Sequence, residues 1–350
     1  MRIAVDAMGG DFAPASIIEG SYLAAKEYSI NTILVGDKEL ISKELSKYPE
    51  TNTISIHHSS EVVDMDEPPT VCLRKKKDSS IKVAVELVKN GEADAYISAG
   101  NTGASMAAGL MILKPLPGVD RPAIAQMLPT LKGSTVLLDV GANVDCKVEY
   151  LVQFAIMGSI YAKKVMKIQN PTVGLLSVGT EDTKGNERSK KALAHLRKIE
   201  YINFVGNVEG RDIYNSTVDV VACDGFVGNV ALKLSEGLAE MLHEMMKLYL
   251  KSNILTVLGY LLARSAFKKF KKRIDYAEYG GAPLLGVNGT GIICHGSSSS
   301  KAIKNAILIA SDICKQNLNQ SIIEELKSLQ LDVGEYKKNN MENSLSKGDS

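Results

Sequence analysis

Ser98-Ala99-Gly100-Asn101-Thr102-Gly103-Ala104 is the stretch on which the interpretation of this chain depends. The segment before it, 93–97, is short and apolar like a strand, and the segment after it, 105–113, has apolar side chains at helical spacing. A turn of small residues between a strand and a helix directs several backbone N–H groups toward one point, where the helix dipole is positive. The stretch predicts an anion site, the alternative being an ordinary connection between a strand and a helix.

The same design recurs along the chain. Turns containing glycine and asparagine follow the apolar segments 135–140, 202–205 and 218–223, and Gly9-Gly10-Asp11 follows the first apolar segment, 3–6. Strands that alternate with helices predict an α/β fold with a mostly parallel sheet flanked by helices. Ligands of such sheets bind beyond the carboxyl ends of the strands. We therefore expect these turns to gather at one sheet edge as a single anion site.

Composition and missing motifs narrow the class of protein. The net charge of the 350 residues is +1, so nothing in the overall charge predicts nucleic-acid binding. The five cysteines are far apart, which indicates reduced thiols in a cytoplasm rather than a zinc site or disulfides. The first residues enter a strand directly, so we expect no signal peptide, and no apolar run reaches the ~18 residues of a membrane span.

Several signatures of other enzyme classes are absent from the sequence. It has no Gly-x-x-x-x-Gly-Lys loop, no Gly-x-Gly-x-x-Gly in its first strand–helix unit and no Gly-x-Ser-x-Gly elbow. These absences argue against a nucleotide-dependent kinase, an ordinary dinucleotide enzyme and a serine esterase. No cluster of histidine, cysteine and carboxylate residues has metal-ligand spacing, so neither a metal nor a cofactor is expected.

Residues from about 235 to 273 predict a helical hairpin that is apolar at its tip and basic on one flank. Such an element can lie in a membrane interface, can form the helix bundle of a dimer, or can be buried in its own domain. The tip residues expected to contact a membrane are Ile254, Leu255, Leu258, Leu261 and Leu262. We expect one α/β domain over residues 1–332, including the hairpin, and a disordered tail over residues 333–350.

Two further features attract attention. Arg74-Lys75-Lys76-Lys77 is a dense positive run, either a solvated face or a docking site for an acidic partner or a phosphorylated ligand. His295 follows a short predicted strand and precedes the serine-rich start of a helix, which makes it the best-placed histidine of the chain for a functional role.

Taken together, the turns resemble those of a known family, the bacterial acyl-carrier-protein:phosphate acyltransferases of phospholipid synthesis. The resemblance extends from Met1 to about Leu331. The segments that carry it are 6–11, 98–104, 138–143, 206–210, 224–229, 281–286 and His295-Gly296.

The resemblance implies a fold like that of isopropylmalate dehydrogenase and phosphotransacetylase, with a protruding helical hairpin. It also implies a homodimer in the cytoplasm, loosely associated with the anionic inner face of the cell membrane. The implied reaction is reversible transfer of a long-chain acyl group from acyl carrier protein to inorganic phosphate, which forms acyl phosphate for a membrane-bound glycerol-3-phosphate acyltransferase. The basic residues that would suit the acidic carrier protein are Arg74, Lys75, Lys76, Lys77, Lys271, Lys272 and Arg273.

Inorganic phosphate is already largely dianionic near neutral pH, so the enzyme's task is to position it against a thioester and to stabilise the developing oxyanion. No covalent acyl-enzyme is required. The candidate catalytic residues are His295, Asn229 and Asn143. The candidate phosphate- or substrate-binding residues are Gly9, Gly10, Asp11, Asn101, Thr102, Gly103, Gly141, Asn207, Gly228, Gly296 and Ser297.

Three alternatives remain at this stage. A phosphotransacetylase acting on short acyl-CoA would need no apolar hairpin. A membrane-associated scaffold would dock acyl carrier protein and a partner acyltransferase without catalysis. A metal-dependent hydroxy-acid dehydrogenase of the same fold would need a carboxylate trio and a dinucleotide site, for which the spacing gives no support.

Overall fold

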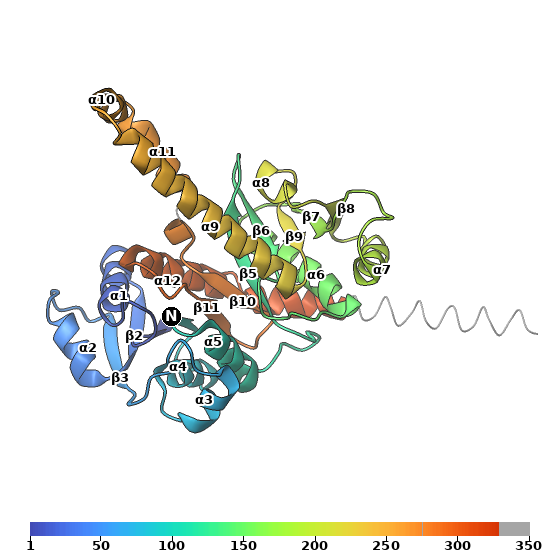
Figure 1. Cartoon of the computed structure of the whole chain (residues 1–350). Helices are drawn as coiled ribbons and strands as arrows, with labels where there is room; N and C mark the ends of the chain where they lie inside the picture. Colours follow the sequence, from blue (N-terminus) through green and yellow to red (C-terminus); the bar gives the residue numbers. More distant parts are fainter. Residues whose placement is uncertain (275, 329–350) are drawn as a thin grey trace, which may run out of the picture.

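The computed structural model describes residues 1–274 and 276–328. Within this range the side chains of residues 271, 272, 274, 276 and 277 are not described. The tail predicted for residues 333–350 lies outside the described residues. Figure 1 shows a central sheet with helices on both faces and a pair of helices that projects far beyond the rest.

The sheet has eleven strands in the order β3-β2-β1-β4-β11-β10-β5-β6-β9-β7-β8. Their bounds are β1 Arg2–Asp6, β2 Asn31–Gly36, β3 Ile54–His58, β4 Ala95–Ser98, β5 Ala123–Pro129, β6 Ser134–Leu138, β7 Thr172–Leu176, β8 Asn203–Val208, β9 Val220–Ala222, β10 Ala282–Leu285 and β11 Thr290–Ile293. Neighbours are parallel except along β11-β10-β5-β6, where the three pairings are antiparallel. The predicted α/β fold with a mostly parallel sheet is confirmed.

Helices cover both faces because successive strand residues are buried on opposite sides: Ile3 and Val5 lie in one core and Ala4 lies in the other. The first core is covered by α1 Ala15–Tyr28, α2 Lys38–Leu45, α6 Val148–Lys164, α7 Glu187–Leu196 and α12 Ser300–Lys315. The second is covered by α3 Pro69–Lys75, α4 Ser80–Lys89, α5 Thr102–Ala108 with the π-helical turn η1 Gly109–Leu113, α8 Asp212–Asn215 and the start of α9 Gly225–Leu250.

The antiparallel pairings in the middle of the sheet have a consequence for the site. Strands β1, β4 and β11 run in one direction, and β6, β7, β8 and β9 run in the other. Their carboxyl ends therefore lie at opposite edges of the sheet. The expectation that all glycine-asparagine turns gather at one edge is wrong, because it assumed a sheet whose strands all share one direction.

The sequence does not reveal β10, which joins the two halves of the sheet. Because β10 is antiparallel to both β11 and β5, these two strands run in the same direction, and the reversal itself lies in the antiparallel pair β5–β6. Gly280 to Gly286 reads as a glycine-rich loop, whereas residues 282–285 form a buried strand that pairs with β11 on one side and with β5 on the other. Glycines at both ends of this short segment hide its strand character from a search for strand patterns.

The helical hairpin is present and projects from the body (Figure 1). It consists of α9, then α10 Ile254–Leu262 at the tip, then α11 Arg264–Ile274, which returns toward the sheet; the 3₁₀ turn η2 Tyr276–Tyr279 leads into β10. No described helix is both long and apolar enough to cross a membrane.

Candidate functional site

The turns after β1, β4 and β11 meet at one edge of the sheet, which we call the His295 corner. The backbone N–H of Asp11 donates to the carbonyl oxygen of Gly296 at 2.8 Å, and Cys294 N–H donates to the carbonyl of Ser98 at 2.8 Å. Gly9 packs so closely on Gly100 that a Cβ at position 9 would lie 2.8 Å from the Gly100 nitrogen. Three segments remote in sequence thus come into direct contact at this corner.

Asp6 links the turns after β1 and β4 through hydrogen bonds. Its buried carboxylate accepts hydrogen bonds from the Ser98 hydroxyl at 2.7 Å and from the Met8 N–H at 3.2 Å. The Ser98 oxygen in turn accepts from the Gly100 N–H at 3.1 Å. Burial raises the pKa of the Asp6 carboxyl, and these hydrogen bonds oppose the shift. Asp6 therefore supplies internal hydrogen-bond acceptors for the turn.

His295 and Ser297 lie just before α12, which begins at Ser300. The Ser297 N–H donates to Nδ1 of the exposed His295 at 3.2 Å, and the Ser297 hydroxyl lies 2.8 Å from the same nitrogen. A neutral ring whose Nδ1 accepts a hydrogen bond carries its proton on Nε2, so His295 offers an N–H donor there. Ser299 caps the helix by accepting from the Ala302 N–H. These residues combine a histidine donor, hydroxyl groups and a positive helix end.

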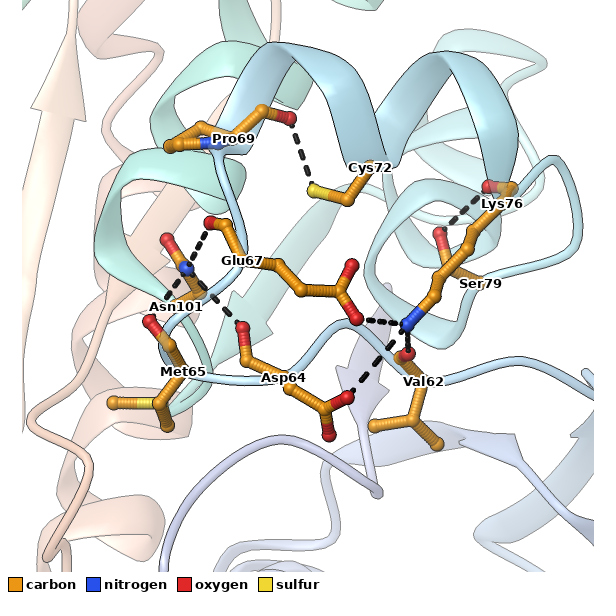
Figure 2. A network of polar contacts seen from close by, with 9 residues as sticks. All are labelled: Val62, Asp64, Met65, Glu67, Pro69, Cys72, Lys76, Ser79 and Asn101. Atoms are coloured by element: carbon orange, nitrogen blue, oxygen red, sulfur yellow. Dashed lines mark hydrogen bonds and ion pairs between the residues drawn. The ribbon is translucent and has the colours of Figure 1, made fainter.

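Asn101, expected to bind phosphate, has other partners in this structure. Its side-chain amide donates to the carbonyl oxygens of Asp64, Met65 and Glu67 at 3.2, 2.8 and 3.0 Å (Figure 2). Its Oδ1 accepts from the Ala104 N–H at 2.9 Å. The residue thus anchors residues 62–68, which we call the 62–68 loop, to the beginning of α5.

Gly103 and Thr102 follow on the same turn. A Cβ at Gly103 would come within 2.5 Å of the Pro69 ring, so glycine is needed there to admit the end of the 62–68 loop. Thr102 is exposed at the first position of α5. The Ser98–Ala104 stretch therefore packs against another segment of the chain, in addition to forming a turn that faces solvent.

The turn after β6 and the start of α9 form a second cluster, the Asn229 corner, at the opposite edge. Here the fully buried Asp139 accepts hydrogen bonds from the backbone N–H groups of Gly141, Ala142 and Asn143 at 3.2, 3.0 and 2.6 Å. The Ile124 N–H donates to it as well, at 3.0 Å. Burial raises the pKa of the Asp139 carboxyl, and the N–H groups oppose that shift. The N–H groups predicted to hold phosphate therefore already hold the protein's own carboxylate.

The two candidate asparagines of this corner differ. The Asn143 amide donates to the Pro122 carbonyl at 2.7 Å and to Asp139 at 2.9 Å, so it too supports the turn. Asn229 is exposed in the first turn of α9, and Gly228 before it packs against the Asp139 backbone. Asn207 lies in neither corner: it is buried on β8 and donates to the Glu181 carbonyl at 3.0 Å.

Some of the predicted basic docking residues are exposed, and others make contacts within the protein. Arg74, Lys75 and Lys77 are exposed, whereas Lys76 pairs with Glu67 and donates to the Val62 carbonyl at 2.6 Å. Arg273 donates from its guanidinium to the carbonyl oxygens of Thr130 and Leu131 at 2.9 and 2.5 Å, which ties the hairpin to the end of β5. The side chains of Lys271 and Lys272 lie outside the described part of the chain.

The tip of the hairpin presents its apolar side chains to solvent. Exposure of the five predicted membrane-contact residues ranges from 52% for Leu258 to 90% for Leu262, and α10 buries none of its residues. Lys268 and Lys269 on the adjoining α11 are exposed as well. No group of three or more histidine, cysteine or carboxylate residues within the described range is arranged to hold a metal ion.

Sequence reasoning missed Asp6, Asp139 and the 62–68 loop as parts of these corners. The two aspartates do leave a signal, because each stands at the carboxyl end of a buried apolar strand, where a carboxylate can accept hydrogen bonds from the turn that follows. The loop leaves none, because its contacts with Asn101 join residues more than thirty positions apart.

The fold is similar to that of solved phosphotransacetylases. A phosphotransacetylase from Streptococcus pyogenes superposes with a TM-score of 0.62 at 18% identity, covering 89% of this chain and 94% of that one. A branched-chain phosphotransacylase from Enterococcus faecalis V583 gives 0.54 at 14% identity, covering 90% and 99%. At these identities the likeness concerns the fold.

Sequence relatives then identify the family. Residues 1–321 match the family model described as fatty acid synthesis protein. The phosphate acyltransferase of Geobacter sulfurreducens is 56% identical over 329 residues, 94% of this chain and 95% of that protein, and that of Pelotomaculum thermopropionicum is 54% identical over 331 residues, 95% and 96%. The chain belongs to the phosphate acyltransferase family and is an acyltransferase of lipid biosynthesis.

Proposed function

We propose that this protein transfers a long-chain fatty acyl group from acyl carrier protein to inorganic phosphate and forms acyl phosphate reversibly for phospholipid synthesis. The family supports the reaction class. The location of the reaction is inferred from the turn before α12, where His295, Ser297 and the helix end lie together.

In the proposed reaction a phosphate oxygen attacks the thioester carbonyl carbon. A C–O bond forms, the C–S bond breaks, and the thiolate leaves and takes up a proton from solvent or from His295. The start of α12 and the Ser297 hydroxyl hold the phosphate, and Nε2–H of His295 donates to the carbonyl oxygen as it becomes negative. The burial of Cys294, next to His295, raises its thiol pKa to about 12, which disfavours a covalent cysteine intermediate there.

The hairpin supports a location at the membrane surface. Its exposed leucines match the acyl boundary of a bilayer, and the basic α11 matches anionic headgroups. We propose a cytoplasmic homodimer that associates peripherally with the inner face of the membrane and passes acyl phosphate to a membrane-bound glycerol-3-phosphate acyltransferase. The exposed Arg74, Lys75 and Lys77 suit docking of the acidic carrier protein, with Lys271 and Lys272 as further candidates.

The reaction is tested with purified protein, radiolabelled phosphate and three donors: palmitoyl-acyl carrier protein, palmitoyl-CoA and acetyl-CoA. We expect acyl phosphate from the carrier-protein donor. Preference for acetyl-CoA would instead indicate a short-chain phosphotransacetylase. No product from any donor would indicate a scaffold.

The site is tested by His295→Ala and Asn229→Ala, with His195→Ala, on the exposed face of α7, as the matched control. Losing one oxyanion donor lowers turnover by roughly a hundredfold or more. We expect that loss for His295→Ala and wild-type turnover for His195→Ala. Unchanged turnover in His295→Ala would remove His295 from the mechanism, and unchanged turnover in Asn229→Ala would remove Asn229 from the candidate catalytic residues.

A further inference from the structure

The 62–68 loop is held from two sides by the side chains of Asn101 and Lys76. Asn101 donates to three of its carbonyl oxygens from the α5 side. On the other side Lys76 bonds to the Val62 carbonyl at 2.6 Å, pairs with Glu67 and lies 3.8 Å from the Asp64 carboxylate (Figure 2). A segment held in this way presents its middle residue, Met65, in a defined place.

Met65 lies against the His295 corner. A Cβ at Gly296 would come within 2.9 Å of the Met65 terminal methyl group, so the thioether side chain rests on the residue that separates His295 from Ser297. Met65 is nevertheless 46% exposed. Phe12, which follows Asp11 in the neighbouring turn, is 57% exposed. Two large apolar side chains therefore stand uncovered beside polar groups suited to a phosphate.

We propose that Met65, held by Asn101 and Lys76, forms the wall of the site that contacts the acyl chain of the substrate near its carbonyl end. The inference rests on the proposed function, since it assigns the acyl group of that reaction to one side of the His295 corner. An unbranched, flexible methionine suits a chain of methylene groups, because it adapts to irregular apolar surfaces. Asn101 is then a positioning residue that acts through Met65.

This assignment explains why the asparagine of the Ser98–Ala104 stretch faces the protein. An asparagine that donated to phosphate would leave three carbonyl oxygens of the loop without this donor. The Asn101 amide instead fixes the apolar wall, while the polar side of the site remains with His295 and Ser297.

The chain contains no tryptophan, which allows a direct binding test that does not depend on turnover. Met65→Trp places a single tryptophan in the proposed wall, and Val71→Trp places one at a similarly exposed position of α3, since Val71 is 45% exposed. The probes are decyl phosphate, below its micelle concentration, and ethyl phosphate. We expect a blue shift for Met65→Trp with decyl phosphate only, and no shift for Val71→Trp. Equal responses to both probes, or none at Met65→Trp, would overturn the proposal.

Kinetics provide the second readout. Contact with one or two methylene groups corresponds to roughly a tenfold change in kcat/KM. We expect Met65→Ala to lower kcat/KM about tenfold for a long-chain donor. The kcat/KM for a two-carbon donor and the KM for phosphate should stay unchanged. Val71→Ala should match the wild type. Asn101→Asp keeps the acceptor that caps α5 but lacks the amide donors, so it should reproduce the Met65→Ala pattern. A uniform loss on both donors would contradict an acyl-chain contact.

The two readouts separate the proposals. If the wild type forms no acyl phosphate but Met65→Trp still responds to decyl phosphate alone, the proposed function fails and the apolar wall stands. If the wild type is active but neither readout depends on chain length, the proposed acyl-chain contact of Met65 is wrong and the proposed function is retained.

Discussion

At the scale of single residues, the corners of this protein are built by carboxylates. A glycine-rich turn exposes N–H groups that need acceptors, and Asp6 and Asp139 supply them from inside the protein. A turn that looks suited to an external oxyanion can thus be completed by an internal one. The His295 corner differs because it also has a histidine and serines at the start of a helix. Among the described hydrogen bonds, none joins Asp6 to these side chains.

Gly228 and Gly237 provide a matched test within α9. A Cβ at Gly228 would overlap the carbonyl oxygen of Asp139, whereas a Cβ at Gly237 would meet no atom within 4 Å. We expect Gly228→Ala to lower the free energy of unfolding by about 1–3 kcal/mol or more, through forced backbone shifts. Gly237→Ala should raise it by up to ~1 kcal/mol, through helix propensity. Urea unfolding measures both, and equal stability of the two variants would contradict the close contact.

At the scale of elements, two segments stand out from the sheet: the 62–68 loop and the hairpin. Each is attached to the body by hydrogen bonds from side chains to backbone carbonyls: Asn101 and Lys76 donate to carbonyls of the loop, and Arg273 of the hairpin donates to carbonyls after β5. In both elements some apolar side chains stay exposed, Met65 in the loop and the leucines at the hairpin tip, and these remain available for ligands.

The loop should respond to pH. The hydrogen bond from Lys76 holds the pKa of the Glu67 carboxyl below its usual range, and Glu67 raises the pKa of Lys76. Because the Glu67 pKa is lower in the folded protein, the pair stabilises the loop above the ordinary glutamate pKa of about 4.3, and this is lost as pH falls through the lowered value. Amide hydrogen exchange of residues 62–68, corrected for intrinsic rates, should therefore accelerate only in acid.

Glu67→Gln provides the control for that experiment. This variant lacks the charge at every pH, so its loop amides should exchange faster already at pH 7 and show little further change in acid. Wild-type protection in Glu67→Gln would mean that the ion pair does not hold the loop.

The hairpin tip should bind anionic membranes. Leu255 and Leu262 are 80% and 90% exposed, and each leucine buried in lipid contributes roughly 1.5–3 kcal/mol. We expect the double variant Leu255→Ser, Leu262→Ser to lose cosedimentation with vesicles that contain phosphatidylglycerol. Leu131→Ser, at an equally uncovered leucine outside the hairpin, should bind as the wild type does. Unchanged binding of the double variant would argue against insertion of the tip.

At the scale of the whole molecule, the sheet consists of two sets of parallel strands joined through β10 and β5. The reversal places the His295 corner at one edge and the Asn229 corner at the other. Residues that look equivalent in sequence therefore have separate surroundings, and a single chain does not bring both corners into one cradle.

The projecting helix α9 predicts a dimer. Leu234, Leu238, Met245 and Leu248 are all exposed along it, and such a stripe is typical of a helix that packs against a partner. We expect sedimentation velocity to give a dimer for the wild type and a monomer for the double variant Leu238→Glu, Met245→Glu. A wild-type monomer at micromolar concentration would exclude the prediction.

The sequence by itself determined the alternation of strands and helices, the hairpin, and the chemical character of each turn. Those properties depend on neighbouring residues: apolar periodicity, glycine and asparagine at strand exits, and leucines beside lysines. Its resemblance to phosphate acyltransferases also indicated the family correctly, because matching segments are spread over most of the chain.

Only the tertiary structure decided which turns share an edge and what each asparagine holds. The direction of a strand follows from its pairing partners: the antiparallel pair β5–β6 reverses the second half of the sheet, and β10, four residues long between glycines, joins β5 to β11 without a local sign. Likewise Asn101 meets the 62–68 loop, and Asn143 meets the carbonyl oxygen of Pro122, through contacts that exist only after folding. A side chain's type sets which hydrogen bonds it can make, but the approach of distant segments selects the partner.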